Sequence, residues 1–463
     1  MKARAIARAL SRVRGAGALL AMLAAALTPA AALAQGARTS PATLQGQQGQ
    51  PALPAPAPSA PDFASDTLTG DWGGLRTRLW EAGVDLTAGY KGELASNVEG
   101  GGPTSATEAG QFAFGATIDS AKRFGWPGGT FQVSIAYRQG APLGVDFLQE
   151  PQEVYGRGDI IRLTELWYEQ KLDDDKVTFK IGRMPQGDFD SFPCYFMNLT
   201  FCGAAGGNIV GDYWFNWPIA QWAGWTRVEL GAFDLMAGVY VTNPTDLDKA
   251  FAPGWFSGAK GVMGRAEVGW SPKFGPSHLR GRYQLGAWYD TGGGDDVLLG
   301  VDGKPFALTG EQPLYRSRRY GYYLQGVQQI TGTGAADPGA DWTTIRGLSI
   351  FFNFIQGDRD TSTLDNQVAV GLFYAAPFAS RPMDHIGIAF GRSDYNYRAA
   401  ESFALERPGI QPPRAEYVSE LYYNYVLFHW IAIQPDVQYV IDPGGYPARK
   451  PAVVVGAKTA INF

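Results

Sequence analysis

The 463-residue chain contains 60 glycines and 13% aromatic residues, and only 18% of its residues are charged, against about 25% in ordinary soluble domains. A mean hydropathy of −0.15 excludes a bundle of membrane-spanning helices. The formal net charge of −5 argues against a nucleic-acid partner, which would favour a basic chain.

Residues 1–34 have the pattern of an export signal. Basic residues come first, the apolar run 15–27 follows, and Ala32-Leu33-Ala34 provides a cleavage site with small residues at its ends. The run is too short for a membrane anchor, because a span needs about 20 apolar residues. Cleavage after Ala34 would remove five basic residues and no acid, which lowers the net charge from −5 to −10.

Two short segments separate this leader from the rest of the chain. Residues 35–65 are rich in Gln, Pro, Ala and Gly, a composition that predicts a disordered periplasmic tether. Attachment of this tether to peptidoglycan or to a partner is an alternative. Residues 66–83 predict a periplasmic helix that is capped by Asp71, stopped by Gly83, and has Trp72, Leu75 and Leu79 on one face.

From Val84 onward, apolar and polar residues alternate in short segments that turn residues separate. In the third segment Phe131, Val133, Ile135 and Tyr137 share one parity, which is typical of a strand with one apolar face. Sixteen such segments are predicted, at 84–94, 112–118, 131–137, 160–172, 177–183, 222–230, 234–242, 261–270, 279–290, 320–330, 343–356, 367–374, 385–392, 415–428, 430–439 and 452–463.

The connections between these segments alternate in length. Short ones such as 173–175 suit the periplasmic side, and long ones such as 291–319 and 393–414 suit the outer side. Acidic residues at 173–175 and 295–296 have a calcium site as one interpretation and solvated turn carboxylates as another. We favour the solvated carboxylates.

The final segment indicates how the sheet is completed. Phe463, Ile461 and Val455 share one parity, and Asn462 and Lys458 the other. A last strand needs a partner for its edge, and within a bilayer a sheet satisfies its backbone by closing on itself. The sequence therefore predicts an all-β protein, a transmembrane antiparallel β-barrel over residues 84–463 that closes at Phe463. An even count of about sixteen strands fits a single-chain barrel with a water-filled lumen. We expect the C-terminal strand to be recognised by the barrel assembly machinery.

The longest connection between strands, residues 184–221, carries nine aromatic side chains. So many aromatics would be hard to explain on a loop that faces water, so we expect the loop to fold into the barrel and narrow it. The only two cysteines, Cys194 and Cys202, lie in this loop, and an oxidising compartment favours a disulfide between them. With three scattered histidines and no further cysteine, neither a metal site nor any cofactor is expected.

Three stretches of the chain carry a family resemblance. They are GDWGGLRTRLWEAGVDLTAGYKGELASNVEGG (70–101), IGRMPQGDFDSFPCYFMNLTFCG (181–203) and AEYVSELYYNYVLFHWIAIQPDVQYVIDPGG (415–445). Together they resemble the carbohydrate-selective, OprB-type porins of bacterial outer membranes, over residues 66–463. The resemblance implies an outer-membrane channel for facilitated diffusion of monosaccharides, glucose above all, with the segment 184–221 as its constriction loop.

A neutral sugar is recognised by aromatic faces and by fixed hydrogen-bonding groups. Candidates for the substrate pathway lie on the lumen parity of the strands and in the constriction loop. They are Arg138, Arg162, Glu165, Arg183, Arg280, Arg282, Gln284, Trp288, Tyr195, Trp214 and Trp217. For each arginine a structural ion pair is the competing interpretation, and for the loop aromatics it is packing against the barrel wall.

Other functions are weighed against this one. A porin that selects polyols or small anions stays open because of the lumen arginines. An outer-membrane enzyme built on a barrel lacks a nucleophile with a base beside it, and a secreted, soluble all-β module conflicts with the apolar rows on the strands. The sequence does not determine the oligomeric state. The expected partners are outer-membrane lipid and a small sugar.

Overall fold

The computed structural model describes residues 61–463 except 144–146, 155–157, 190–191, 204–205, 249–250, 252–254 and 335–339. The predicted export signal and residues 35–60 of the predicted tether lie outside the described residues and stay predictions.

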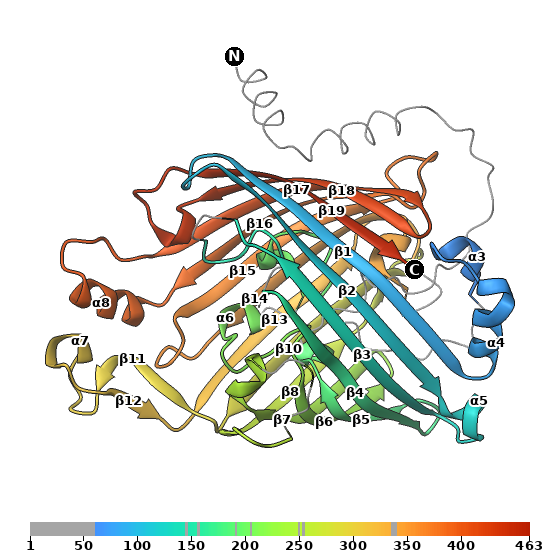
Figure 1. The fold of residues 1–463 in the computed structure, drawn as a ribbon, viewed down its shortest axis with the longest axis horizontal. Helices are drawn as coiled ribbons and strands as arrows, with labels where there is room; N and C mark the ends of the chain where they lie inside the picture. The colour runs from blue at the N-terminus through green and yellow to red at the C-terminus, as the bar shows by residue number, and fades with distance from the viewer. Residues whose placement is uncertain are drawn as a thin grey trace, which may run out of the picture.

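Sixteen antiparallel strands form one closed barrel (Figure 1), which confirms the predicted fold class. Each strand pairs with the next along the chain, and β19 returns to pair with β1, so no sheet edge is left open. The barrel strands are β1 (Val84–Glu99), β2 (Ser105–Asp119), β3 (Gly129–Gly140), β4 (Ile160–Leu172), β5 (Val177–Met184), β6 (Gln221–Leu230), β7 (Phe233–Thr242), β8 (Gly261–Trp270), β10 (Leu279–Asp290), β13 (Arg319–Gln329), β14 (Gly347–Gln356), β15 (Leu364–Ala375), β16 (His385–Tyr395), β17 (Ala415–Phe428), β18 (Ile431–Ile441) and β19 (Ala452–Asn462).

The remaining elements lie at the two ends of the barrel or inside it. The additional short strands are β9 (Lys273–Phe274), which extends the pairing of β10, and the separate hairpin β11 (Gly294–Gly300) and β12 (Pro313–Arg316). The helices are α3 (Phe63–Asp66), α4 (Leu75–Glu81), α5 (Ser120–Phe124), α6 (Gly206–Ile209), α7 (Phe306–Thr309) and α8 (Tyr397–Glu406), and the 3-10 turns are η2 (Trp72–Gly74), η3 (Gln186–Asp188), η4 (Leu199–Phe201), η5 (Pro244–Leu247), η6 (Trp342–Thr344) and η7 (Pro443–Gly445).

The period-2 pattern sorts side chains between lipid and lumen. On β3, Phe131 and Val133 are exposed on the outer surface, whereas Gln132 and Ser134 are buried on the inner one. The same alternation continues around the barrel, so an apolar belt faces the membrane and a mostly polar surface faces inward.

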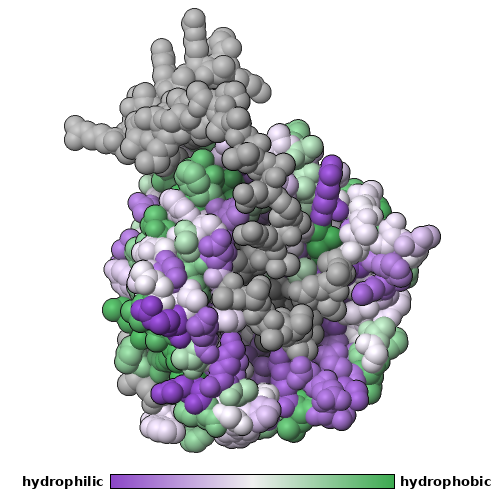
Figure 2. Space-filling view, turned by 90° about the vertical axis from the view of Figure 1, so that its right-hand side faces the viewer, coloured by the Kyte–Doolittle hydropathy of each residue, from purple (hydrophilic) through white to green (hydrophobic). Residues whose placement is uncertain are grey.

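The two ends of the barrel differ. Figure 1 shows α3, α4, α5 and the end of β19 at one mouth, called here the periplasmic mouth after the predicted orientation, and α7, α8 and the β11–β12 hairpin at the other. Figure 2 looks onto the periplasmic mouth, where hydrophilic side chains gather around the rim and hydrophobic patches lie toward the outer margin.

The segment before β1 corrects the predicted helix over 66–83. The α-helix covers only Leu75–Glu81, because Gly73 and Gly74 adopt left-handed backbone angles (φ +66° and +85°) that interrupt it. The expected apolar face is also wrong, since Trp72 and Leu75 are exposed and Arg76 is the buried residue. The predicted tether is too long at its end, because Phe63–Asp66 forms a helical turn with Phe63 buried. Among the described residues, no helix is both long and apolar enough to cross a membrane.

Candidate functional site

The connection between β5 and β6, called here the constriction loop, lies inside the barrel. Its aromatic side chains, apart from the partly buried Trp217, are buried, and several pack against lumen-facing side chains of distant strands. Phe192 makes an edge-to-face contact with Phe351 of β14, with ring centroids 5.2 Å apart, and Phe196 makes one with Tyr422 of β17 at 4.8 Å. In the other limb of the loop, Trp214 packs edge-to-face on Trp288 of β10 at 4.8 Å. The loop therefore fills much of the lumen.

The tip of this loop is fixed by a disulfide and by hydrogen bonds to the wall. Cys194 and Cys202 are bonded, which confirms the predicted bridge. Between them, the backbone N–H groups of Met197 and Asn198 donate to the carboxylate of Glu420 at 2.6 and 2.8 Å. The ammonium group of Lys458 donates to a carbonyl oxygen of the same tip at 3.1 Å.

A second connection, between β3 and β4, also enters the lumen, which the alternation of the strands does not predict. Glu153 of this connection is buried and forms ion pairs with Lys91 of β1 at 3.1 Å and Lys458 of β19 at 3.2 Å. Burial opposes ionisation of Glu153, but these ammonium groups and the guanidinium of Arg138 outweigh it and hold its pKa at about 2. The backbone N–H of Glu153 also donates to the carbonyl of Met197, so the two inward loops support each other.

The periplasmic connection between β13 and β14 approaches the constriction loop from the opposite end. The hydroxyl of Tyr195 donates to the carboxylate of Asp341 at 3.0 Å. The guanidinium of Arg280 lies 4.2 Å from the ring centre of Trp342, which is buried. Tyr195 and Arg280, both pathway candidates, are thus engaged in contacts between loops and wall.

Most other predicted pathway residues have protein partners. Arg162 and Arg183 converge on the η5 turn, where Arg162 donates to the carbonyl of Asp246 at 3.1 Å and Arg183 to its carboxylate at 3.4 Å. Arg282 forms a bidentate pair with Asp234 at 2.6 and 2.9 Å. These arginines hold the wall and its loops together, and their part in the substrate pathway stays a prediction.

Gln284 and Trp288 are likewise buried in the wall of β10. The amide nitrogen of Gln284 donates to Glu267 at 2.9 Å, and the indole N–H of Trp288 donates to the hydroxyl of Tyr213 at 3.1 Å. The latter bond ties the constriction loop to β10. Trp214 donates to the side-chain oxygen of Asn216 within the loop at 3.2 Å.

The remaining candidates lie together on the side of β2–β4. Gln111 of β2 accepts hydrogen bonds from Arg138 of β3 at 2.8 Å and from the indole N–H of Trp217 at 2.9 Å. On β4, Glu165 accepts from Ser134 and, at 3.2 Å, from the indole N–H of Trp167. Trp217, Glu165 and Trp167 are only partly buried, whereas most lumen side chains named above are fully buried. Sequence reasoning missed Trp167, although its lumen parity on β4 could have identified it.

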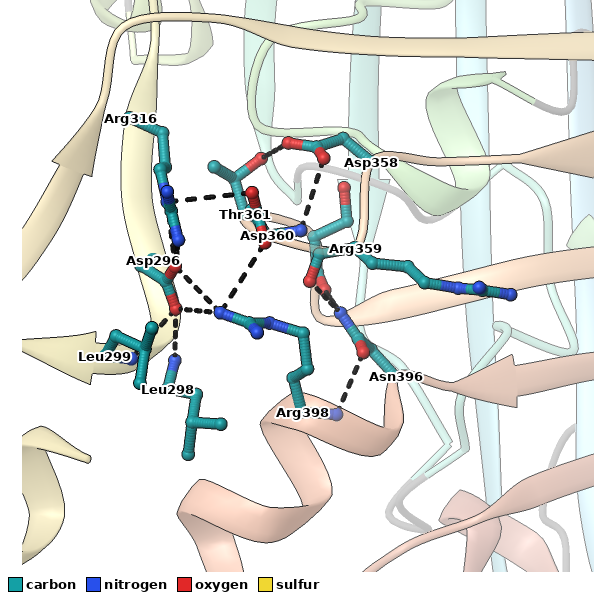
Figure 3. A network of polar contacts seen from close by, with 11 residues as sticks. Asp296, Leu298, Leu299, Arg316, Asp358, Arg359, Asp360, Thr361, Asn396 and Arg398 are labelled. Atoms are coloured by element: carbon teal, nitrogen blue, oxygen red, sulfur yellow. Dashed lines mark hydrogen bonds and ion pairs between the residues drawn. The ribbon is translucent and has the colours of Figure 1, made fainter. Parts of the chain in front are cut away.

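An ion-pair network joins the extracellular elements (Figure 3). Asp296 of β11 accepts from Arg316 of β12 at 2.8 Å and from Arg398 of α8 at 2.6 Å, and both arginines also approach Asp360 of the β14–β15 connection. Burial opposes ionisation of Asp296, but the N–H groups of Leu299 and Leu298 and the two arginines hold its pKa below its ordinary value. The favoured interpretation of the acids at 295–296 as solvated turn carboxylates is therefore wrong for Asp296, which is buried and paired with two arginines, whereas Asp295 is exposed.

At the periplasmic mouth, the N-terminal segment contacts the seam where the barrel closes. Arg76 donates to the main-chain oxygen of Phe463 at 2.8 Å and to that of Leu86 in β1 at 2.9 Å. The N–H of Leu68 donates to the carbonyl of Asn462 at 2.8 Å, and the N–H of Phe463 donates to Ala88 at 2.9 Å. The segment thus bridges the first and last strands.

A closed sixteen-stranded barrel with an apolar belt, a polar interior and a long loop folded into its lumen defines a porin, a diffusion channel of the bacterial outer membrane. Residues 104–463 match the family model described as "Carbohydrate-selective porin, OprB family". The chain belongs to this family of carbohydrate-selective porins.

Individual relatives agree with this assignment. The chain is 37% identical to Porin B of Pseudomonas aeruginosa over 425 residues, which cover 86% of this chain and 92% of that protein. It is 31% identical to the putative porin QuiX of Acinetobacter baylyi over 430 residues, which cover 86% and 93%. A high-pH structure of Pseudomonas putida OprB matches with a TM-score of 0.81 at 38% identity, covering 87% of this chain and all of that chain.

Proposed function

We propose that the protein conducts glucose-like monosaccharides into the periplasm by facilitated diffusion along the side of the lumen formed by β2–β4. The asymmetric packing of the constriction loop supports this proposal most strongly. The apolar clusters around the loop include buried side chains of β5–β8, β10, β13–β19 and β1. Among the described residues, β2–β4 contribute to these clusters only Trp167, which is partly buried. We place the pathway on this side, where Trp217, Glu165 and Trp167 are only partly buried.

The chemistry on this side suits a sugar. The indole N–H groups of Trp217 and Trp167 already have acceptors in Gln111 and Glu165. The ring of Trp217 can offer an apolar face, against which the C–H face of a sugar ring can lie, whereas the ammonium group of Lys180 lies over the ring of Trp167 at 3.9 Å. Glu165 and Asp188 are partly buried and carry acceptor oxygens for sugar hydroxyls. Asp188 also pairs at 3.1 Å with Lys180, the residue that lies over Trp167. Such groups bind weakly and at several points, as conduction requires.

The test is conductance through planar bilayers that contain the purified porin, titrated with glucose, a second hexose, a linear polyol and chloride. Glucose should reduce the current, and Trp217→Leu should raise its half-blocking concentration several-fold because the ring face is lost. Trp270→Leu is the matched control, because Trp270 lies on the exposed outer face of β8. Indifference of the current to every sugar would contradict the proposal and leave a general pore.

A porin for small anions is the second candidate, and the observation that favours it is the guanidinium of Arg138 beside Trp217. This candidate predicts a current carried mostly by chloride and unaffected by glucose. The same bilayers distinguish the two candidates through the reversal potential in a salt gradient.

A further inference from the structure

Arg265 of β8 is a buried lumen residue that the pathway described above does not use. Its side chain is only 4% exposed, and its Nε and Nη2 groups have no hydrogen-bond partner among the described residues. No carboxylate of the described chain forms an ion pair with it, although buried charges are ordinarily paired. A guanidinium kept in such a place needs another explanation than stabilising the wall.

The contacts of Arg265 are with the constriction loop, and they involve both of its limbs. The descending limb of the loop follows β5 and contains Phe189, and the ascending limb precedes β6 and contains Trp214. The Cζ atom of Arg265 lies 4.4 Å from the ring centre of Phe189 and 3.6 Å from that of Trp214. Attraction between a guanidinium and aromatic faces is strengthened when water is excluded, as it is here. One wall residue thus holds the two limbs that flank the pore.

Hydrogen bonds at the base of the loop reinforce this arrangement. Nη1 of Arg265 donates to the backbone and side-chain oxygens of Gln186 at 3.2 and 3.1 Å. The N–H of Gln186 donates in turn to the carbonyl of Phe215 at 2.9 Å, which joins the descending limb to the ascending one. Trp217 follows Phe215 by two residues, and Asp188 precedes Phe189 directly. Both pathway side chains therefore stand next to groups that Arg265 fixes.

We propose that Arg265 is a positioning residue that sets the width of the pore by clamping both limbs of the constriction loop to β8. This inference deepens the proposed function and rests on its assignment of the constriction loop. Arg265 acts through Phe189, Trp214 and Gln186 and does not itself touch the substrate.

The experiment compares Arg265→Met with Arg265→Lys and with a matched control. Methionine keeps the apolar bulk but removes the charge and the donors, and lysine keeps the charge without the planar donor fork. The control is Arg227→Met, because Arg227 is a buried lumen arginine beside Asp234, which also keeps its pair with Arg282. Each variant is reconstituted in liposomes, and uptake rates of glucose and sucrose are measured by swelling.

The sucrose-to-glucose rate ratio should rise several-fold in Arg265→Met, less in Arg265→Lys and not at all in Arg227→Met. Single-channel records of Arg265→Met should show a larger and more variable conductance. The heat-dependent gel mobility of the folded barrel should stay as in the wild type, which distinguishes a moved loop from a damaged wall.

Several outcomes would overturn the inference. A folded Arg265→Met porin with the wild-type ratio contradicts it directly. If Arg265→Met does not fold, Trp214→Leu serves as the second test, because it alters the loop but not the wall. This variant should raise the sucrose-to-glucose rate ratio, and an unchanged ratio would also contradict the inference. A wild-type porin that passes sucrose and glucose equally would instead contradict the proposed constriction. That result would count against the proposed function itself and not against the role of Arg265 alone.

Discussion

Glu153 and Lys458 lie 3.2 Å apart although one belongs to an extracellular connection and the other to the last strand of the barrel. Lys91 of β1 completes the group at 3.1 Å from the same carboxylate. This arrangement holds one inward loop against the two strands that form the barrel seam. It also brings the ammonium groups of Lys91 and Lys458 close together. The carboxylate of Glu153 between them makes this proximity favourable.

Substitution Glu153→Gln should therefore lower the free energy of unfolding by about 3–5 kcal/mol, since it leaves buried charges without their partner. Urea titration of the porin in lipid measures this change. The matched control is Asp173→Asn, because Asp173 pairs with Lys176 at 3.6 Å in an exposed turn. That change should cost less than about 1 kcal/mol, and equal effects of the two variants would contradict the assignment.

The pH dependence of this anchor has a definite sign. The pKa of Glu153 is lowered from 4.5 to about 2, so its contribution to stability is complete above pH 4.5 and is lost as the pH falls toward 2. Stability and current noise should therefore differ between wild type and Glu153→Gln at pH 7 and converge at pH 2. A difference that vanishes between pH 8 and pH 6 would show that another group controls the anchor.

Removing the disulfide should have a moderate effect. The bridge spans eight positions, and for a loop of this size the chain-entropy model gives a loss of about 2.5 kcal/mol. The double variant Cys194→Ser/Cys202→Ser should still fold, because Glu420 and Lys458 hold the loop tip independently. Urea titration and single-channel noise, compared with wild type with and without reductant, check this. Failure of the double variant to fold would show that the bridge determines the loop position.

Disrupting the extracellular ion-pair network should loosen the outer loops and leave the barrel unchanged. Asp296→Asn removes the charge that holds Arg316 and Arg398, so α8 and the β11–β12 hairpin should become accessible to protease on intact cells. Asp295→Asn is the matched control, because Asp295 is the exposed neighbour on the same strand. Equal cleavage of both variants would exclude the network as the cause.

At the other mouth, Arg76→Ala should weaken the seam. The residue donates charge-assisted hydrogen bonds to Phe463 and Leu86, and such bonds contribute about 1.5–3 kcal/mol each. The temperature at which the folded band disappears in gel assays should fall. Arg78→Ala, two positions along and exposed, should leave it unchanged, and a similar fall in both would point to a general loss of helix α4.

The barrel itself could be predicted from the sequence because lipid imposes a strict alternation on every strand. Phe131 and Val133 face out and Gln132 and Ser134 face in, as their parity requires. The prediction was wrong where local backbone angles decide. Gly73 and Gly74 shorten the helix, and a 3-10 turn at Trp342–Thr344 displaces the expected start of β14 from 343 to 347.

The candidate site was only partly within reach of such reasoning. Parity places Arg138 and Arg282 in the lumen, but it does not say that Arg282 is held by Asp234. The buried position of Glu153 could not be predicted, because a glutamate in a polar connection is ordinarily expected to be solvated. Arg265 could not be distinguished from other lumen arginines, since its role depends on a loop that lies 50 to 80 residues earlier in the chain.

The constriction loop touches well-separated strands of a wide, thin cylinder, from Trp288 on β10 to Tyr422 on β17. An empty tube of this width could flatten under lateral membrane pressure, and an internal strut resists that deformation. Solute selection and mechanical stiffness are therefore properties of the same segment. A variant made more permissive by trimming the loop should also be a softer barrel.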